Sequence, residues 1–254
     1  MTTEPDSADL RQLPPGLTPA WGAAPRARRG PKPSHSVAQV VEAAVELADA
    51  DGLAAASLPN IAASLGLTTN ALYRYVSSKD ELLVLLADAG FGPPPDLPDD
   101  LGWRATARAW THAALERYRA RPWLLDVPVR GDAVTPHLLG WTELLLSALS
   151  AAGLSDVDAL GCARLVTDVA RGTAERLRAV ADPDSASFPG HAAGVRAFLH
   201  PLLADRGYPR VAALTAERQY PAAADADFGL DRVLDGIAAL LEGTRSGRHH
   251  GGGA

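Results

Sequence analysis

Residues 57 to 82 read SLPNIAASLGLTTNALYRYVSSKDEL, with apolar residues at helical spacing on both sides of a glycine. A first short helix is predicted to place its apolar residues on one face: Leu58, Ile61, Ala62 and Leu65. Pro59 falls in the first turn, where its missing N–H breaks no helical bond. Gly66 ends this helix, and a second helix is predicted from Thr69 to Val76. The stretch therefore predicts two short helices joined by a tight glycine turn.

The second helix has an apolar and a polar face. Leu72 and Val76 fall on the side that can pack on the first helix, and a polar stripe faces the other way: Thr69, Asn70, Tyr73 and Arg74. Hydroxyl, amide, phenol and guanidinium groups can bond base edges and phosphate oxygens in a DNA major groove. The alternative is an ordinary solvated polar face, which an isolated helix does not exclude.

Helical periodicity continues on both sides of this stretch. A helix is predicted from Val37 to the glycine at 52, and Ser77 and Ser78 open another through a capping-box pattern with Asp80 and Glu81. Longer helices are predicted at 101–120, 134–152, 156–180, 191–205, 208–218 and 226–242. No alternating β pattern of useful length is present, so the expected class is all-α.

Charge is unevenly distributed along the 254 residues. The formal net charge is −6, yet the first 79 residues hold as many basic as acidic side chains, and residues 57–79 contain Arg74 and Lys79 with no acid. An acidic body with a local basic face suits a protein that meets a polyanion at one end.

Several classes of protein are disfavoured by composition. No uncharged apolar run is long enough to span a membrane, and residues 1–20 lack the basic start and apolar run of a secretory signal. A single cysteine, Cys162, excludes an internal disulfide framework and a multi-cysteine zinc site. We expect a cytoplasmic protein that contacts no membrane.

Residues 52 to 83 closely resemble the DNA-binding domain of the tetracycline-repressor (TetR) family. The resemblance rests on the Leu65-Gly66 turn, the Leu72-Tyr73 pair, Val76 three residues later, and the Lys79-Asp80 pair that opens the next helix. A weaker similarity to the all-α regulatory domain covers 101–180 and 226–242. It is carried by Arg121-Pro122-Trp123, by the segment at 152–155 and by the segment at 228–231.

The resemblance implies a domain organisation. A flexible basic, proline-rich tail (1–33) precedes a helix-turn-helix DNA-binding domain (34–92), which is followed by a helical ligand-binding and dimerisation domain (101–243) and a disordered tail (244–254). It also implies partners: a double-stranded DNA operator, a second copy of the chain, and a small-molecule effector.

Carried over by position, the resemblance assigns DNA contacts. Base edges or backbone would be contacted by Thr69, Asn70, Ala71, Tyr73, Arg74 and Tyr75, and Lys79 would bind a phosphate. Pro59 departs from the tetracycline repressor, which has a base-reading arginine there, so the tetracycline operator sequence is not expected. Asn60 is the nearest polar substitute.

Two further sets of residues are candidates for binding. In the N-terminal segment, Arg28, Arg29 and Lys32, with Arg26, would lie along phosphates or enter the minor groove; the alternative is a solubilising tail. The resemblance places the dimer interface on two apolar stripes: Val166, Val169, Thr173, Leu230, Leu234, Ile237 and Leu241. The alternative is the core of a monomer, and both stripes can contribute to core and interface together.

The effector site is expected among aromatic and polar residues of the longer helices. Its candidates are Trp103, Trp110, His112, His137, Trp141 and Phe198, which would favour a small hydrophobic or aromatic molecule. Each of these aromatic residues is more often plain core. The histidine and acid arrangement of a metal–tetracycline site is not evident, so neither a metal nor a cofactor is expected.

An all-α enzyme is the competing class, but it requires clustered catalytic groups. The seven histidines are scattered, and there is neither an HExxH motif nor a glycine-rich phosphate loop. We therefore expect a transcriptional regulator and no catalytic residues. Repressor and activator remain open, because the sign of regulation depends on where the operator lies.

Overall fold

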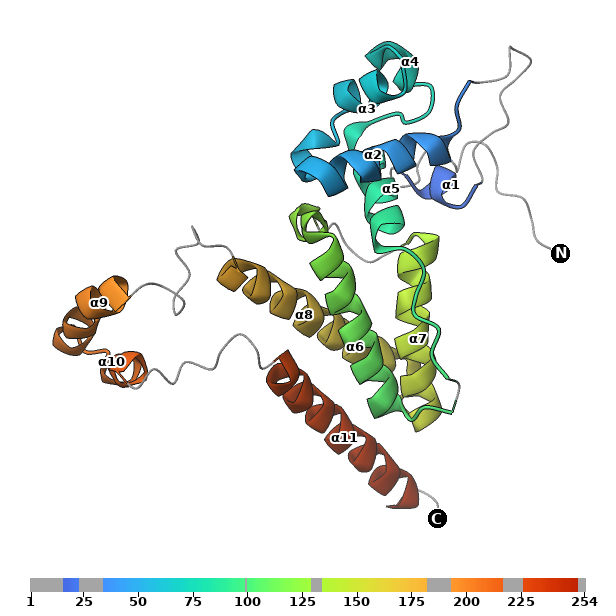
Figure 1. The fold of residues 1–254 in the computed structure, drawn as a ribbon. Helices are drawn as coiled ribbons and strands as arrows, with labels where there is room; N and C mark the ends of the chain where they lie inside the picture. The colour runs from blue at the N-terminus through green and yellow to red at the C-terminus, as the bar shows by residue number, and fades with distance from the viewer. Residues whose placement is uncertain are drawn as a thin grey trace. The chain divides into compact units, whose positions relative to one another are not determined.

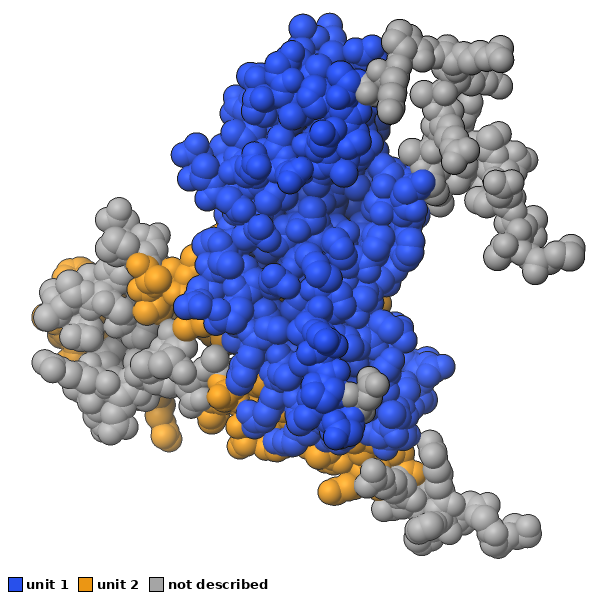
Figure 2. Space-filling view, turned by 45° about the vertical axis from the view of Figure 1, so that its right-hand side comes forward, with its two compact units in different colours: residues 1–163 blue, residues 164–254 orange. Residues whose placement is uncertain are grey.

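The computed structural model describes residues 16–22, 34–98, 100–128, 134–181, 193–216 and 226–250. These residues form helices and turns, with no β-strand among them, which confirms the all-α expectation. The chain divides into two compact units, residues 1–163 and 164–254 (Figure 2).

The N-terminal part of the first unit contains α2 (Val37–Asp51), η2 (Leu53–Ala55), α3 (Leu58–Ser64), α4 (Thr69–Leu72) and α5 (Lys79–Phe91). α2 packs on α5, and α3 packs on α4 (Figure 1). Their common core is fully buried and includes Val40, Ala44, Ile61, Leu72, Val76 and Leu86. α2 starts with a reciprocal capping box, in which Ser36 N–H donates to Gln39 Oε1 (2.8 Å) and Gln39 N–H donates to Ser36 Oγ (3.2 Å).

The rest of the first unit is built from α6 (Trp103–Ala120), η3 (Pro122–Asp126), α7 (Pro136–Ala152) and the start of α8 (Asp156–Ala181). α6 and α7 lie side by side, and the C-terminal part of α5 contacts α7 and η3 (Figure 1). α7 ends at Gly153, whose φ of 111° is in the left-handed region that glycine adopts without strain. α5 thus packs both on the short N-terminal helices and on α7.

Part of the segment predicted as a flexible tail is folded. Residues Leu17–Ala20 form α1, which packs on α5. Gly16 has a φ of 83°, and a Cβ there would lie 2.9 Å from Val84 Cβ, so the chain passes very close to α5. Trp21 Nε1–H donates to the carbonyl of Val134 (2.8 Å). Proline-rich composition did not reveal this helix because the residues that it packs on are far away in the sequence.

The second unit contains the rest of α8 together with α9 (Ala193–Asp205), α10 (Pro209–Ala216) and α11 (Ala226–His250). α9 packs on α10, with Ala212 buried. α11 extends to His250, so the helix includes residues 244–250 of the segment predicted as a disordered tail. The helix was predicted to end at residue 242, before a glycine-rich stretch, but glycine only lowers the propensity for helix and does not stop one.

Candidate DNA-binding interface

α4 and the turn that follows it form the candidate reading surface, which we call the reader (residues 69–76). Thr68 caps α4, with its Oγ1 accepting from the Ala71 N–H (3.2 Å). The regular helix ends at Leu72, four residues earlier than predicted, because Tyr75 N–H bonds to Leu72 O in a tighter, three-residue step (2.9 Å). Val76 N–H also bonds to Leu72 O (3.2 Å), so the chain keeps its helical direction through the reader.

The reader presents its two faces as the sequence predicted. Leu72 and Val76 have no exposed surface, whereas Asn70, Tyr73 and Arg74 are exposed, Tyr73 by 49%. Thr69, Ala71 and Tyr75 are half-buried. The ring of Tyr75 meets that of His35 edge to face, with centroids 6.4 Å apart, which fixes this end of the reader against the residues before α2.

Two cations beside the reader are unpaired within the described part of the chain. The side chains of Arg74 and Lys79 are exposed, and no described residue forms a hydrogen bond or ion pair with them. Lys79 is the first residue of α5, where the helix dipole disfavours a positive charge. A phosphate oxygen at this position would be bound by the lysine and favoured by the same dipole.

The residues that surround Pro59 have local structural roles. Pro59 lies in the first turn of α3, as expected, and Ser57 Oγ accepts from the Asn60 N–H (3.4 Å). Asn60 Nδ2–H donates to the carbonyl of Ala55 (3.0 Å), so its amide closes the turn before α3. This bond competes with the predicted role of Asn60 as a substitute for a base-reading arginine.

The basic residues of the N-terminal segment, Arg26, Arg28, Arg29 and Lys32, lie outside the described residues. The structure describes the residues on both sides of this segment. Before it, α1 packs on α5, and after it, α2 begins at Val37. The predicted DNA contacts of this segment stay predictions.

Two of the candidate effector-site residues lie in an aromatic core. Trp110 and Trp141 are buried and meet edge to face with centroids 5.4 Å apart, and Phe91 packs against Trp141 at 4.9 Å. Trp110 Nε1–H donates to Trp141 O (2.7 Å), and Trp141 Nε1–H donates to Gly92 O (2.9 Å). Both indoles are therefore satisfied within the chain.

The other effector-site candidates are distributed over both units. Trp103 and His137 are half-buried in the first unit, and His112 is exposed. Phe198 is 68% exposed and belongs to the second unit. The structure thus brings together Trp110 and Trp141 among the predicted residues.

The predicted dimer-interface residues are almost all buried within the single chain. Six are buried, namely Val166, Thr173, Leu230, Leu234, Ile237 and Leu241, and Val169 is half-buried. α11 approaches α8 where a Cβ on Gly229 would lie 3.9 Å from Val169 Cγ1. These side chains are core residues of the chain, and other apolar side chains of the same helices are exposed: Leu165, Phe228 and Leu240.

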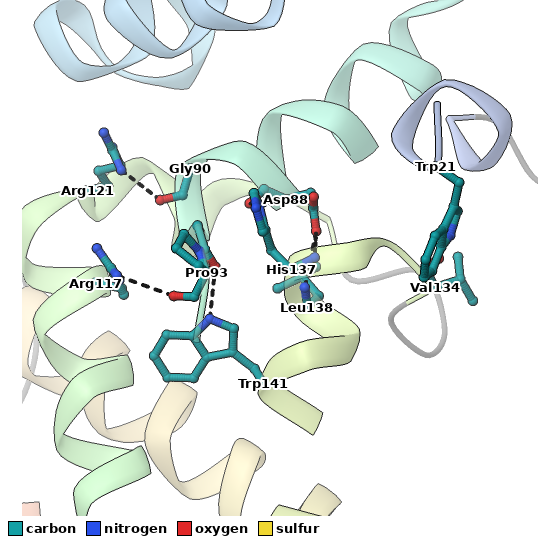
Figure 3. A network of polar contacts seen from close by, with 11 residues as sticks. Trp21, Asp88, Gly90, Pro93, Arg117, Arg121, Val134, His137, Leu138 and Trp141 are labelled. Atoms are coloured by element: carbon teal, nitrogen blue, oxygen red, sulfur yellow. Dashed lines mark hydrogen bonds and ion pairs between the residues drawn. The ribbon is translucent and has the colours of Figure 1, made fainter. Parts of the chain in front are cut away.

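A polar junction at the C-terminal end of α5 was not predicted from the sequence (Figure 3). Asp88 Oδ1 accepts from the main-chain N–H groups of His137 (3.0 Å) and Leu138 (3.1 Å) at the start of α7. Arg121 Nη1–H donates to Gly90 O (2.9 Å), while its Nε lies 3.1 Å from Asp49 Oδ1. Trp123 Nε1–H also donates to Asp49 Oδ1 (2.7 Å). Single polar residues in apolar helices carry no periodic signal, so this junction is visible only in three dimensions.

The described residues contain neither a candidate metal-ion cluster nor a helix that could span a membrane. Among the described residues, no group of three or more His, Cys, Asp or Glu side chains is arranged to hold a metal ion. In the same part of the chain, every helix is too short or too polar to cross a bilayer.

Comparison with known proteins gives matches over nearly the whole chain. Residues 40–86 match the model of the bacterial regulatory proteins of the tetR family, and residues 94–241 match the tetracyclin repressor-like C-terminal domain. The HTH-type transcriptional repressor DrrR1 of Streptomyces coeruleorubidus is 35% identical over 235 residues, which are 87% of this chain and 84% of that protein.

Solved structures share the fold at lower identity. Apo ActR from Streptomyces coelicolor has a TM-score of 0.67 and 20% identity over 85% of this chain and 100% of that one. ActR in complex with actinorhodin has the same TM-score and 22% identity, over 82% of this chain and 98% of that one. BioQ with its natural double-stranded DNA operator has a TM-score of 0.51 and 22% identity, over 81% of this chain and 99% of that one.

The two family models follow one another along the chain in the order of the folded elements. The first covers the reader with its supporting helices, and the second starts after α5 and ends within α11. The chain belongs to the tetR family of bacterial regulatory proteins.

Proposed function

We propose that the protein is a ligand-responsive, sequence-specific repressor that binds a palindromic operator as a homodimer and is released by a small hydrophobic or aromatic molecule. The observation that carries the proposal is the reader, in which Asn70, Tyr73 and Arg74 are exposed on one face while Leu72 and Val76 are buried on the other. Arg74 and Lys79 have no hydrogen-bond or ion-pair partner among the described residues. The similar protein from Streptomyces coeruleorubidus is a transcriptional repressor, which favours repression. An activator or multi-target regulator of the same fold is the alternative.

On DNA, the reader would enter the major groove. Asn70, Tyr73 and Arg74 would reach base edges or adjacent phosphates, with Thr69, Ala71 and Tyr75 beside them, and Lys79 would bind the backbone. A dimer would place two readers about one helical turn (~34 Å) apart, and this spacing requires an operator with two-fold symmetry.

The N-terminal segment would add affinity that does not depend on sequence. Neutralising phosphates with Arg26, Arg28, Arg29 and Lys32 releases counterions, so binding would weaken steeply with salt. Because α1 packs on α5, deletion of the whole segment would also remove folded structure. The sharper variant replaces these four basic residues by glutamine and leaves residues 1–22 intact.

For this variant we expect a shallower slope of log affinity against log salt, by up to about one unit for each phosphate that the variant no longer neutralises. A slope identical to that of the parent protein would show that the basic residues make no contact with DNA.

The dimer interface would be formed by the outer faces of α8 and α11. The buried stripes are used within the chain, so the apolar side chains available to a second copy are those exposed on the same helices. Leu165 is 52% exposed, Phe228 63% and Leu240 40%. Gly236 and Gly243 are also exposed on α11 and would allow close approach of a partner helix.

The effector would bind beside the aromatic core of α6 and α7. Trp110 and Trp141 would form its apolar wall, and Trp103, His112 and His137 would provide contacts at the edge; Phe198 lies in the other unit. ActR, which shares the fold, has been solved with actinorhodin, and this favours a small organic effector for the present protein.

The deciding experiment is fluorescence anisotropy with the DNA upstream of the protein's own gene, at two salt concentrations and with unrelated DNA as competitor. Binding of two protomers per site that survives the competitor supports the proposal, and the complex can then be screened for releasing molecules. Weak binding that is equal on unrelated DNA and lost with salt would contradict a specific operator at that place.

A further inference from the structure

The start of α7 is capped by a side chain from another helix. Thr135 occupies the N-cap position with an extended backbone (φ −102°, ψ 154°), the geometry in which a threonine hydroxyl normally accepts from the second or third N–H of the helix. Its side chain makes no such bond. Asp88 Oδ1, from α5, accepts from both of these N–H groups, those of His137 and Leu138, at 3.0 and 3.1 Å (Figure 3).

The Thr135 hydroxyl has no hydrogen-bond partner among the described residues. Thr135 is 2% exposed, and its Oγ1 is buried without a hydrogen bond to any described residue. A buried unsatisfied hydroxyl is unfavourable, because it gives up its hydrogen bonds to water and gains none in the protein. The structure therefore holds a competent cap residue in an unfavourable state, next to the two donors that it would serve if Asp88 moved away.

Asp88 is held at this position from more than one side. It is 8% exposed, and the ring Nδ1 of His137 lies 3.1 Å from its main-chain oxygen and 3.2 Å from its Oδ2. Two further carbonyls at the end of α5 accept from other elements, Gly90 O from Arg121 and Gly92 O from Trp141. These are discrete polar bonds that are either formed or broken, in contrast to apolar packing, which can slide.

α5 leads directly to the reader. Lys79 is the first residue of α5 and Asp88 lies nine residues further on, so about 14 Å of helix separates the candidate phosphate contact from the cap of α7. A change in how Asp88 meets α7 would act on the same helix whose first residue adjoins the reader.

We propose that Asp88 and Thr135 are alternative caps of α7, and that exchange between them is the step by which α5 and the reader are released from α7. When Asp88 is withdrawn, Thr135 Oγ1 accepts from the freed N–H group and the hydroxyl is satisfied. The helix start thus stays capped in both states, which keeps the free-energy gap between them small and lets a weak bias select one of them. Asp88 is a positioning residue, and the link to DNA rests on the proposed function.

A double-mutant cycle in urea tests the exchange without DNA or effector. Asp88→Ala removes the cap from α5, and Thr135→Val removes the hydroxyl while keeping the shape of the side chain. Each single variant leaves one cap, and only the double variant leaves none. We expect the folding constant of the double variant to fall at least about fivefold below the product of the two single effects.

A second pairing provides the control. Thr111 is a buried threonine of α6 whose Oγ1–H donates to Ala107 O (2.8 Å), remote from the start of α7 in sequence. Asp88→Ala combined with Thr111→Val should be additive. Additive effects in the Asp88 and Thr135 cycle as well would overturn the proposal.

Hydrogen exchange at the amides of His137 and Leu138 gives a readout that general destabilisation does not mimic. Protection of at least one of them should persist in Asp88→Ala, where Thr135 takes over, and be lost from both in the double variant. Equal loss in Asp88→Ala and the double variant would show that Thr135 does not substitute, and the exchange would be rejected.

The link to the reader is tested separately on the DNA upstream of the protein's own gene. Asp88→Ala should lose affinity for that DNA, while Thr135→Val should keep it. Unchanged affinity in Asp88→Ala, together with a non-additive cycle, would overturn the coupling to the reader. If the parent protein itself does not bind this DNA specifically, the operator proposed at that place is contradicted, and the urea cycle still decides the cap exchange.

Discussion

Arg74 lies on the reader, its side chain is exposed, and no described residue forms a hydrogen bond or ion pair with it. A guanidinium that donates two hydrogen bonds to a guanine in the major groove discriminates between bases, and its removal leaves the fold untouched. We expect Arg74→Ala to weaken binding to the specific site by about 1–3 kcal/mol, measured by anisotropy, with an unchanged urea midpoint.

Arg119 offers a matched control for that substitution. It is exposed on α6, a different helix from the reader, and is paired with Glu116 at 2.6 Å. Arg119→Ala removes the same charge from the chain, so it should alter DNA affinity only through net charge. Equal effects of the two substitutions would show that Arg74 contributes electrostatic attraction and reads no base.

Cys162 is a residue whose ionisation is linked to folding. Burial of the thiol, followed by the negative charge of Asp158, raises the pKa of Cys162 above its ordinary value. The folded state then holds its proton at a pH where the unfolded thiol has lost it. Stability is therefore expected to fall as pH rises past about 8.5, the pKa of an unperturbed thiol.

This prediction is checked with urea unfolding between pH 7 and pH 10. Cys162→Ala lowers stability at every pH, because a buried side chain is shortened, but it should flatten the alkaline decline. Iodoacetamide should also label the folded protein at pH 7.5 more slowly than the protein in urea. Parallel declines in parent and variant would assign the alkaline loss to other groups.

At the scale of elements, the path of α5 past η3 depends on a glycine. A Cβ at Gly90 would overlap Trp123 Cη2 and lie 2.9 Å from its Cζ2, so the indole occupies the space that a side chain needs. Trp123 is also fixed by its bond to Asp49. Gly90→Ala should therefore destabilise the fold by about 1–3 kcal/mol through overpacking, measured by urea or thermal unfolding.

Gly161 of α8 serves as the comparison, because it is exposed and a Cβ there meets no atom within 4 Å. Gly161→Ala should be neutral or stabilising by up to about 1 kcal/mol, through the higher helix propensity of alanine. If Gly90→Ala behaves in the same way, the contact with Trp123 is not a constraint on α5.

Helix starts and the reader faces were predictable because they depend on local chemistry. Ser57 and Ser78 cap α3 and α5 as their sequence context indicated, and Leu72 and Val76 are buried beneath the polar stripe. The cap of α7 was not predictable. Thr135 has the residue type and backbone of a cap, yet its place is taken by Asp88, which lies on a different helix far earlier in the sequence.

At the scale of the whole molecule, the helical periodicity of the sequence identified which faces of α8 and α11 are buried. It did not identify whether the same chain or a second copy covers those faces. An apolar stripe looks the same whether it packs inside the chain or against a second copy. Leu230 and Leu234 proved to be core, while Leu165 and Leu240 are exposed on the same two helices. Their exposure, absent from any one-dimensional pattern, is what directs the dimer proposal to the outer faces.

The dimer proposal is tested by Leu240→Glu. A carboxylate buried in an apolar interface without a partner is unfavourable by several kcal/mol, so this variant should sediment as one chain where the parent sediments as two, and lose operator affinity while keeping its helical content. Val134→Glu is the control: Val134 is also 40% exposed but lies outside α8 and α11, and its hydrogen bond with Trp21 is made through the carbonyl, which the substitution keeps. It should remain a dimer. A dimeric Leu240→Glu would place the interface elsewhere, and a monomeric parent would refute the dimer itself.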